Sequence, residues 1–152
     1  MKKDVYIENK FINILNKDTS SFNLDIDNKY DVLKYIADVL LEKGLVNENY
    51  FESLLKREEL ESTEIGKKFA LVHGNQKYIK NSSLSFIKLR KPIKWKVDTV
   101  QYIFVIAARA DDYSKYSMKE FFKIINLVLN NGDLEAIDNY EDLVNLFFKY
   151  IL

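Results

Sequence analysis

The alternation of apolar and polar positions along the chain predicts four β-strands. Residues 21–26 alternate with a period of two, which predicts a strand with one covered face. Residues 69–72 form a short apolar run typical of a buried strand, and residues 83–89 alternate again. Residues 100–108 make the most continuous apolar run and predict a central strand buried on both faces. The sole proline lies in residues 91–95, where we expect an edge or a turn.

Apolar residues with helical spacing predict two helices in the first half of the chain. Asn28 is suited to cap the first helix, whose apolar positions fall within residues 33–41. Gly44 follows this helix and suits a left-handed position after its end. Asn47 is suited to cap the second helix, which we expect to end near Arg57.

Two further helices are predicted near the C-terminus. Ser117 and Glu120 form a capping-box pair in front of an apolar face within residues 121–129. Asn139 with Asp142 is suited to start the last helix. Strands and helices are interspersed along the chain, which favours α/β layers. We expect one domain that spans residues 1–152.

Composition and charge narrow the function classes. Lys plus Arg and Asp plus Glu both number 23, so the formal net charge is zero, which counts against nucleic acid as the main partner. The absence of cysteine excludes disulfides, thiolate catalysis and cysteine-type zinc sites in this sequence. No apolar stretch reaches the roughly 18–20 residues of a membrane span, and the first residues lack a signal-peptide core. We therefore expect a cytoplasmic protein without membrane insertion.

The only histidine, His73, is the main candidate for chemistry. It follows the predicted strand 69–72, so we expect it at the edge of a sheet, with Arg57 and Thr63 arriving from the preceding loop. A metal site would need more histidine or cysteine ligands, and the hydrolase pattern Gly-x-Ser-x-Gly is absent, so we expect neither metal nor cofactor. A phosphoryl acceptor demands less: one free ring nitrogen, a group that orients the other nitrogen, and cationic or hydroxyl partners. Arg57 and Thr63 can supply these partners.

Each candidate residue also has a purely structural interpretation. His73 can be a hydrogen-bonded structural histidine at a strand end, and Arg57 can be a solvated cation at a helix end. Thr63 can cap a turn, and Ser117 is explained as an N-cap. The pair Phe121-Phe122 is expected in the core.

The order of these segments resembles a known family. A helix, Arg57-Glu58, and then Ser62-Thr63-x-Ile-Gly-(x)3-Ala-(x)2-His-Gly together resemble the enzyme IIA (EIIA) domain of the fructose/mannitol class, part of the bacterial phosphoenolpyruvate-dependent sugar phosphotransferase system. The resemblance covers about residues 20–152. It implies a mixed β-sheet flanked by helices on both faces.

The same resemblance implies a function and roles for single residues. His73 would accept a phosphoryl group from the phosphocarrier HPr, itself phosphorylated on histidine, and pass it to a cysteine of an enzyme IIB (EIIB) domain. Arg57 would balance the charge of the phosphoryl group, and Thr63 would hydrogen-bond its oxygens. No cofactor or metal is implied.

The sequence departs from the family pattern at two positions. Val72 stands where the family usually has proline before the acceptor histidine, and Ser117 stands where many members have a second histidine. A serine there can still donate a hydrogen bond, so Ser117 is a fourth candidate site residue, but it cannot act as an imidazole partner. Such departures are typical of EIIA-like domains that end certain transcriptional regulators and antiterminators, where phosphorylation acts as a switch on a partner domain. Three hypotheses follow: a phosphocarrier in sugar transport, a regulatory domain excised from the C-terminus of a regulator, and an interaction module that is never phosphorylated.

Overall fold

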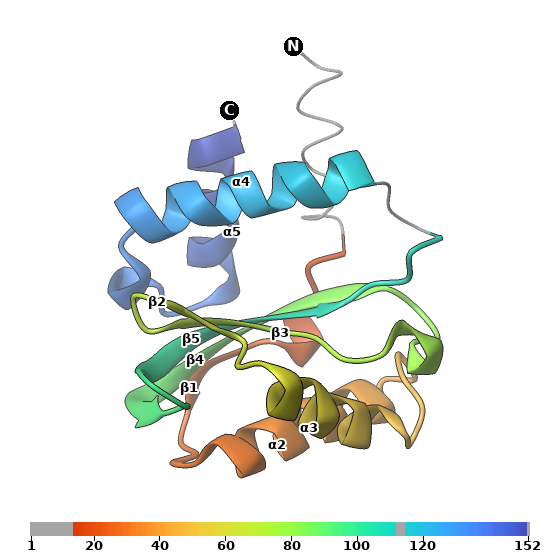
Figure 1. Cartoon of the computed structure of the whole chain (residues 1–152). Helices are drawn as coiled ribbons and strands as arrows, with labels where there is room; N and C mark the ends of the chain where they lie inside the picture. The colour runs from red at the N-terminus through yellow and green to blue at the C-terminus, as the bar shows by residue number, and fades with distance from the viewer. Residues whose placement is uncertain (1–13, 112–114, 152) are drawn as a thin grey trace.

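The computed structural model describes residues 14–111 and 115–151, without the side chains of residues 115–118, 120 and 151. A five-stranded sheet of order β1-β4-β5-β3-β2 lies between two helical layers, with α2 and α3 on one face and α4 and α5 on the other (Figure 1). The elements are η1 (Lys17–Thr19), β1 (Ser21–Leu24), α2 (Lys29–Glu42), α3 (Tyr50–Leu60), β2 (Glu64–Gly66), β3 (Phe69–Val72), η2 (Gln76–Tyr78), β4 (Ser83–Lys94), β5 (Thr99–Ala107), α4 (Lys115–Asn131), η3 (Leu134–Ala136) and α5 (Tyr140–Ile151). The predicted fold class, a mixed sheet with helices on both faces, is confirmed.

The strand pairings place the C-terminal ends of β3 and β5 side by side. These two strands are parallel, with Val72 opposite Val105, whereas β4 pairs antiparallel with β5 and β2 antiparallel with β3. β1 pairs parallel with β4. β5 is the central strand, as its apolar run predicted. The residues that follow Val72 and Ala107 therefore share one end of the sheet.

The predicted boundaries of α2 are confirmed by its caps. The Oδ1 atom of Asn28 accepts a hydrogen bond of 2.9 Å from the backbone N–H of Asp31, which satisfies one free donor of the first turn. Gly44, after the helix end, has a φ of 71°, the left-handed conformation that glycine adopts without strain.

The start of α3 differs from the prediction. The Oδ1 atom of Asn47 accepts from the N–H of Asn49 at 2.9 Å, so Asn47 stabilises the turn before the helix and does not cap it. Asn49 occupies the N-cap position without a side-chain cap. The helix also continues to Leu60, which places Arg57 in its last turn.

The expectation of an edge or a turn around Pro92 is met as an edge, whereas the expectation that Ser117 caps a helix was wrong. Pro92 lies inside β4, where the register against β5 shifts between Lys88 and Ile93 and the pairing with β1 has ended beyond Leu89. A proline is tolerated there because no regular ladder bond needs its missing N–H. α4 begins at Lys115, so Ser117 lies in its first turn and not at the N-cap. The prediction for α5 is confirmed, because Asn139 Oδ1 accepts from the N–H of Asp142 at 2.8 Å.

The core consists of two apolar layers, one on each face of the sheet. Along β4, Ile87 and Leu89 pack toward α2 and α3, whereas Leu84 and Phe86 pack toward α4 and α5. This alternation, visible in the sequence, is why β4 serves both layers. Phe104 of β5 is the centre of the aromatic packing on the α4 and α5 side.

Candidate functional site

His73 lies at the C-terminal end of β3 and is half-buried. His73 directly follows the last residue of β3, so the expectation that it lies where a strand ends at the border of the sheet is confirmed. β3 itself is not the outermost strand, because β2 pairs along its outer side. Arg57 reaches the histidine from the last turn of α3 and not from a loop. The histidine is therefore held between a strand end and a helix end.

Both imidazole nitrogens of His73 have partners. Arg57 Nε donates a hydrogen bond of 3.0 Å to Nε2, and Nδ1 lies 3.3 Å from the backbone carbonyl oxygen of Leu71. An arginine can only donate, so Nε2 must accept and the ring proton must lie on Nδ1, which donates to Leu71. We assign this tautomer from the hydrogen-bond geometry. It leaves the nucleophilic lone pair of the ring on Nε2.

The surroundings favour the neutral form of the imidazole. Burial is the largest effect that lowers the pKa of His73 below its ordinary value of 6.5, and the positive charge of Arg57 lowers this pKa further. The Leu71 carbonyl and the negative charge of Glu58 act in the opposite direction without reversing the result. A neutral imidazole is the form that can act as a nucleophile.

Thr63 belongs to a buried polar network beside the Arg57–His73 pair. This residue is 3% exposed. Its hydroxyl donates to Glu58 Oε1 and accepts from Trp95 Nε1 at 3.2 Å, and its backbone N–H donates to Glu58 Oε2 at 3.3 Å. These hydrogen bonds lead to Glu58 and Trp95 and not to the imidazole. The sequence suggested Thr63 as a direct partner of the transferred group, but it assigned no role at the site to Glu58, which lies in the family motif, or to Trp95.

The segment after His73 packs closely against one face of α3. A Cβ atom on Gly74 would lie 2.6 Å from Ser53 Oγ and 3.0 Å from Tyr50 Cε1, so only glycine fits without displacement. Ser53 Oγ also accepts a hydrogen bond of 3.0 Å from the N–H of Asn75. Ser53 and Arg57 are four residues apart and lie on one helix face, so α3 contacts this segment at two successive turns.

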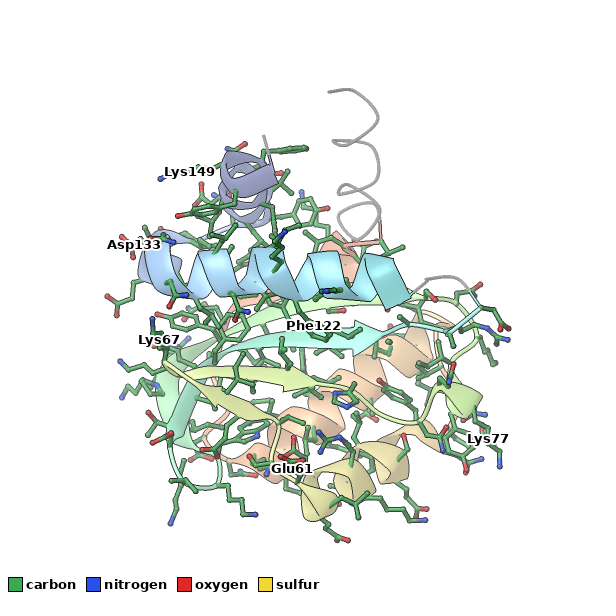
Figure 2. All side chains as sticks on the ribbon, turned by 45° about the horizontal axis from the view of Figure 1, so that its top comes forward. Glu61, Lys67, Lys77, Phe122, Asp133 and Lys149 are labelled. Carbon is green, nitrogen blue, oxygen red and sulfur yellow. The ribbon has the colours of Figure 1, made fainter. Side chains whose placement is uncertain are left out.

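A pocket of about 550 Å³ opens beside the histidine at the shared end of β3 and β5. His73, Ile106, Arg109 and Phe122 contribute to its lining. Figure 2 shows Phe122 on the side of α4 that faces the sheet. This residue is 39% exposed. Phe122 was expected in the core, and only its neighbour Phe121 is buried there. Arg109, which sequence reasoning missed, donates to the carbonyl of Ile79 at 3.0 Å.

Other parts of the expected site are untested or lie outside the described residues. The side chain of Ser117 is outside the described part of the chain, so its role stays a prediction. Among the residues that the structure describes, no group of three or more His, Cys, Asp or Glu side chains could hold a metal ion. In the same residues, no helix has the length and apolar character needed to cross a membrane.

Comparison with known proteins identifies two kinds of relative. The chain is 31% identical over 88 residues to the transcriptional regulator ManR of Bacillus subtilis, which covers 58% of this chain and 14% of the regulator. It is 22% identical to the probable licABCH operon regulator of the same organism, over 91% of this chain and 22% of the regulator. It is 24% identical to the mannitol-specific phosphotransferase enzyme IIA component of B. subtilis, over 88% of this chain and 96% of that protein. The chain thus spans less than a quarter of either regulator.

Solved structures share the fold. The IIA mannitol structure from Escherichia coli aligns with a TM-score of 0.68 at 17% identity, over 85% of this chain and 96% of that one. The complex of enzyme IIAMTL with phosphorylated enzyme IIBMTL from E. coli aligns with a TM-score of 0.72 at 16% identity, over 89% and 99% of the two chains. The model of the family described as phosphoenolpyruvate-dependent sugar phosphotransferase system, EIIA 2, matches residues 13–150. The chain therefore belongs to the EIIA 2 family.

Proposed function

We propose that this domain accepts a phosphoryl group on Nε2 of His73 from phospho-HPr and passes it to a cysteine of an EIIB domain. The observation that carries the proposal is the Arg57–His73 pair: a neutral imidazole whose lone pair lies on Nε2, with a guanidinium next to it. Family membership supports the same chemistry. We also propose that the protein is located in the cytoplasm.

The transfer step needs one rearrangement at the site. The Nε2 lone pair attacks the phosphorus of the donor phosphohistidine, the N–P bond of the donor breaks, and the donor imidazole leaves with the electron pair of that bond. The proton on Nδ1 stays on the ring, held toward the Leu71 carbonyl. Arg57 must release Nε2 and donate instead to the phosphoryl oxygens, where its charge offsets the charge of the group. Direct assistance by Thr63 would require its hydroxyl to leave Glu58.

The pocket beside His73 supports a protein as donor and acceptor. Phe122 and Ile106 give it an apolar wall, and Arg109 adds a positive charge. Exposed aromatic and arginine side chains are typical of protein interfaces. A structural relative is solved in complex with a phosphorylated IIB enzyme, which supports EIIB as the acceptor here.

A regulatory role is the second candidate function. It is favoured by the similarity to ManR and to the probable licABCH operon regulator, of which this chain matches only a part. In that role a phosphoryl group on His73 adds negative charge next to Arg57 and changes the contact with a neighbouring domain of the same regulator. The third hypothesis, a module that is never phosphorylated, predicts that His73→Ala leaves partner binding unchanged.

Mass spectrometry of the intact protein tests the proposal. Wild type and His73→Ala are each incubated with phosphoenolpyruvate, enzyme I and HPr, with cognate EIIB added in a second step. We expect an acid-labile phosphoryl adduct on wild type alone. Loss of that adduct to EIIB supports transport, whereas an adduct that persists with EIIB supports regulation. No adduct on wild type, with enzyme I and HPr shown to be active, would refute phosphoryl acceptance.

A further inference from the structure

A buried carboxylate lies at the junction of four elements next to the histidine. Glu58, in the last turn of α3, is 8% exposed. Its Oε2 atom pairs with Lys29 Nζ of α2 at 2.8 Å, and its two oxygens accept from the hydroxyl and the N–H of Thr63. A buried carboxylate is stable only when paired and hydrogen-bonded in this way.

Trp95 completes this junction from the far end of β4. Its Nε1–H donates to the Thr63 hydroxyl at 3.2 Å, and Lys29 Nζ lies 5.2 Å from the centre of its ring. The hydroxyl of Thr63 thus gives its one proton to Glu58 and accepts from the indole. Since every member has its partners, the network holds the end of α3 against the loop before β2.

Glu58 connects to both nitrogens of His73 along separate paths. On one side it is the neighbour of Arg57, which donates to Nε2 and also to the backbone carbonyl of Glu61 in the turn that Glu58 ties down. On the other side Glu58 holds Thr63, whose carbonyl accepts from the N–H of Leu71 at 3.0 Å. The Leu71 carbonyl in turn faces Nδ1.

We propose that Glu58 is a positioning residue that sets the orientation of Arg57 and of the His73 ring, and that Thr63 serves the site through Glu58 without contacting the transferred group. Its effect on phosphoryl transfer rests on the function proposed above. Its effect on the imidazole does not, because the tautomer of His73 is a property of the protein alone.

The single histidine makes this proposal measurable by NMR, because its ring nitrogens cannot be confused with others. Glu58→Gln keeps the size of the side chain but removes its charge and one of its acceptor oxygens. Thr63→Val keeps the shape and removes the hydroxyl. Glu59→Gln, on the next residue, is the matched control because Glu59 is exposed. Circular dichroism and thermal melting establish that each variant is folded.

We expect the Nδ1–H tautomer to dominate in wild type and in Glu59→Gln at a pH above 6.5, the ordinary pKa of histidine. In Glu58→Gln and in Thr63→Val we expect a mixture of tautomers, because Arg57 and the Leu71 carbonyl are no longer held. Phosphorylation by phospho-HPr should slow by about tenfold or more in these two variants, since small misplacements of reacting groups cost this much. The double variant Glu58→Gln/Thr63→Val should be phosphorylated at a rate within about twofold of the slower single variant. This is expected for two residues that act as one unit.

Two results would overturn the proposal. The first is that Glu58→Gln and Thr63→Val are both folded and both show the same ratio of His73 tautomers as wild type. The second is a Thr63→Val variant that keeps the wild-type tautomer but loses phosphorylation, which would mean that Thr63 contacts the phosphoryl group directly. If wild type itself is not phosphorylated, the proposed function fails, and the tautomer ratios still decide the role of Glu58.

Discussion

Gly74 provides the sharpest test of how α3 and the histidine segment are held together. In Gly74→Ala the new Cβ would lie 2.6 Å from Ser53 Oγ, 3.0 Å from Tyr50 Cε1 and 3.2 Å from Leu54 Cδ2. All three atoms belong to buried side chains of α3, so none can turn away into solvent. The φ of Gly74 is not in the left-handed region, so the cost is steric and not a backbone strain. Overpacking of this kind lowers the free energy of unfolding by about 1–3 kcal/mol.

The same contact predicts a functional effect and a partial rescue. Moving α3 away from Gly74 also moves Arg57, so the rate of phosphorylation should fall together with stability. Ser53→Ala removes the atom nearest to the new methyl group. The free energy of unfolding of the double variant Gly74→Ala/Ser53→Ala should therefore be about 1 kcal/mol higher than the sum of the two single effects predicts.

Urea unfolding of the four proteins in this cycle measures the coupling. Gly44→Ala serves as control, because Gly44 has a φ of 71° and a Cβ added there would meet no atom within 4 Å. That variant should lose about 1–2 kcal/mol through backbone strain, with no rescue by Ser53→Ala. The steric argument would be refuted if Gly74→Ala were as stable as wild type. It would also be refuted if Ser53→Ala showed the same coupling energy with Gly44→Ala as with Gly74→Ala.

Three further predictions concern charge, pH and the core. Arg57→Gln should raise the pKa of His73, because the guanidinium charge is one cause that lowers this pKa. NMR titration of the single histidine measures the change, and an unchanged or lower pKa would contradict the Arg57–His73 geometry. Because folding lowers the pKa of His73, the unfolded chain binds its proton more readily, so this histidine should cost stability as the pH falls through 6.5. Urea unfolding between pH about 5 and about 8 should show the loss in wild type and less of it in His73→Gln, and equal pH profiles would refute it. Phe104→Ala should lower the free energy of unfolding by about 3–5 kcal/mol, as measured by urea unfolding, because four other phenylalanine rings pack against Phe104; a loss under about 1 kcal/mol would contradict that packing.

The parts of the fold that could be predicted depend on local signals. The Asn28 and Asn139 caps and the central strand within residues 100–108 are encoded by neighbouring residues, and all three are confirmed. Asn47 was misplaced because an asparagine that stabilises a turn and one that caps a helix have the same local sequence. The sequence could not decide between an edge and a turn at Pro92, because the end of the β1 pairing at Leu89 depends on a strand far away in the chain.

The site was only partly predictable for a similar reason. His73 and Arg57 were named from sequence, and the structure brings them together. The partners of Thr63 could not be named, because Trp95 lies 32 residues away and Glu58 looks like any glutamate near a helix end. Their roles depend on burial, which becomes visible only when α2, α3 and the end of β4 meet.

NMR of the phosphorylated wild-type protein shows directly whether Nε2 of His73 accepts the phosphoryl group. The ring nitrogens of the single histidine are isotope-labelled, and the protein is phosphorylated with phosphoenolpyruvate, enzyme I and HPr. We predict that Nε2 couples to phosphorus and that Nδ1 keeps its proton, directed at the Leu71 carbonyl. A phosphorus coupling at Nδ1, or phosphorylation that leaves both ring nitrogens unchanged, would refute phosphoryl acceptance on Nε2.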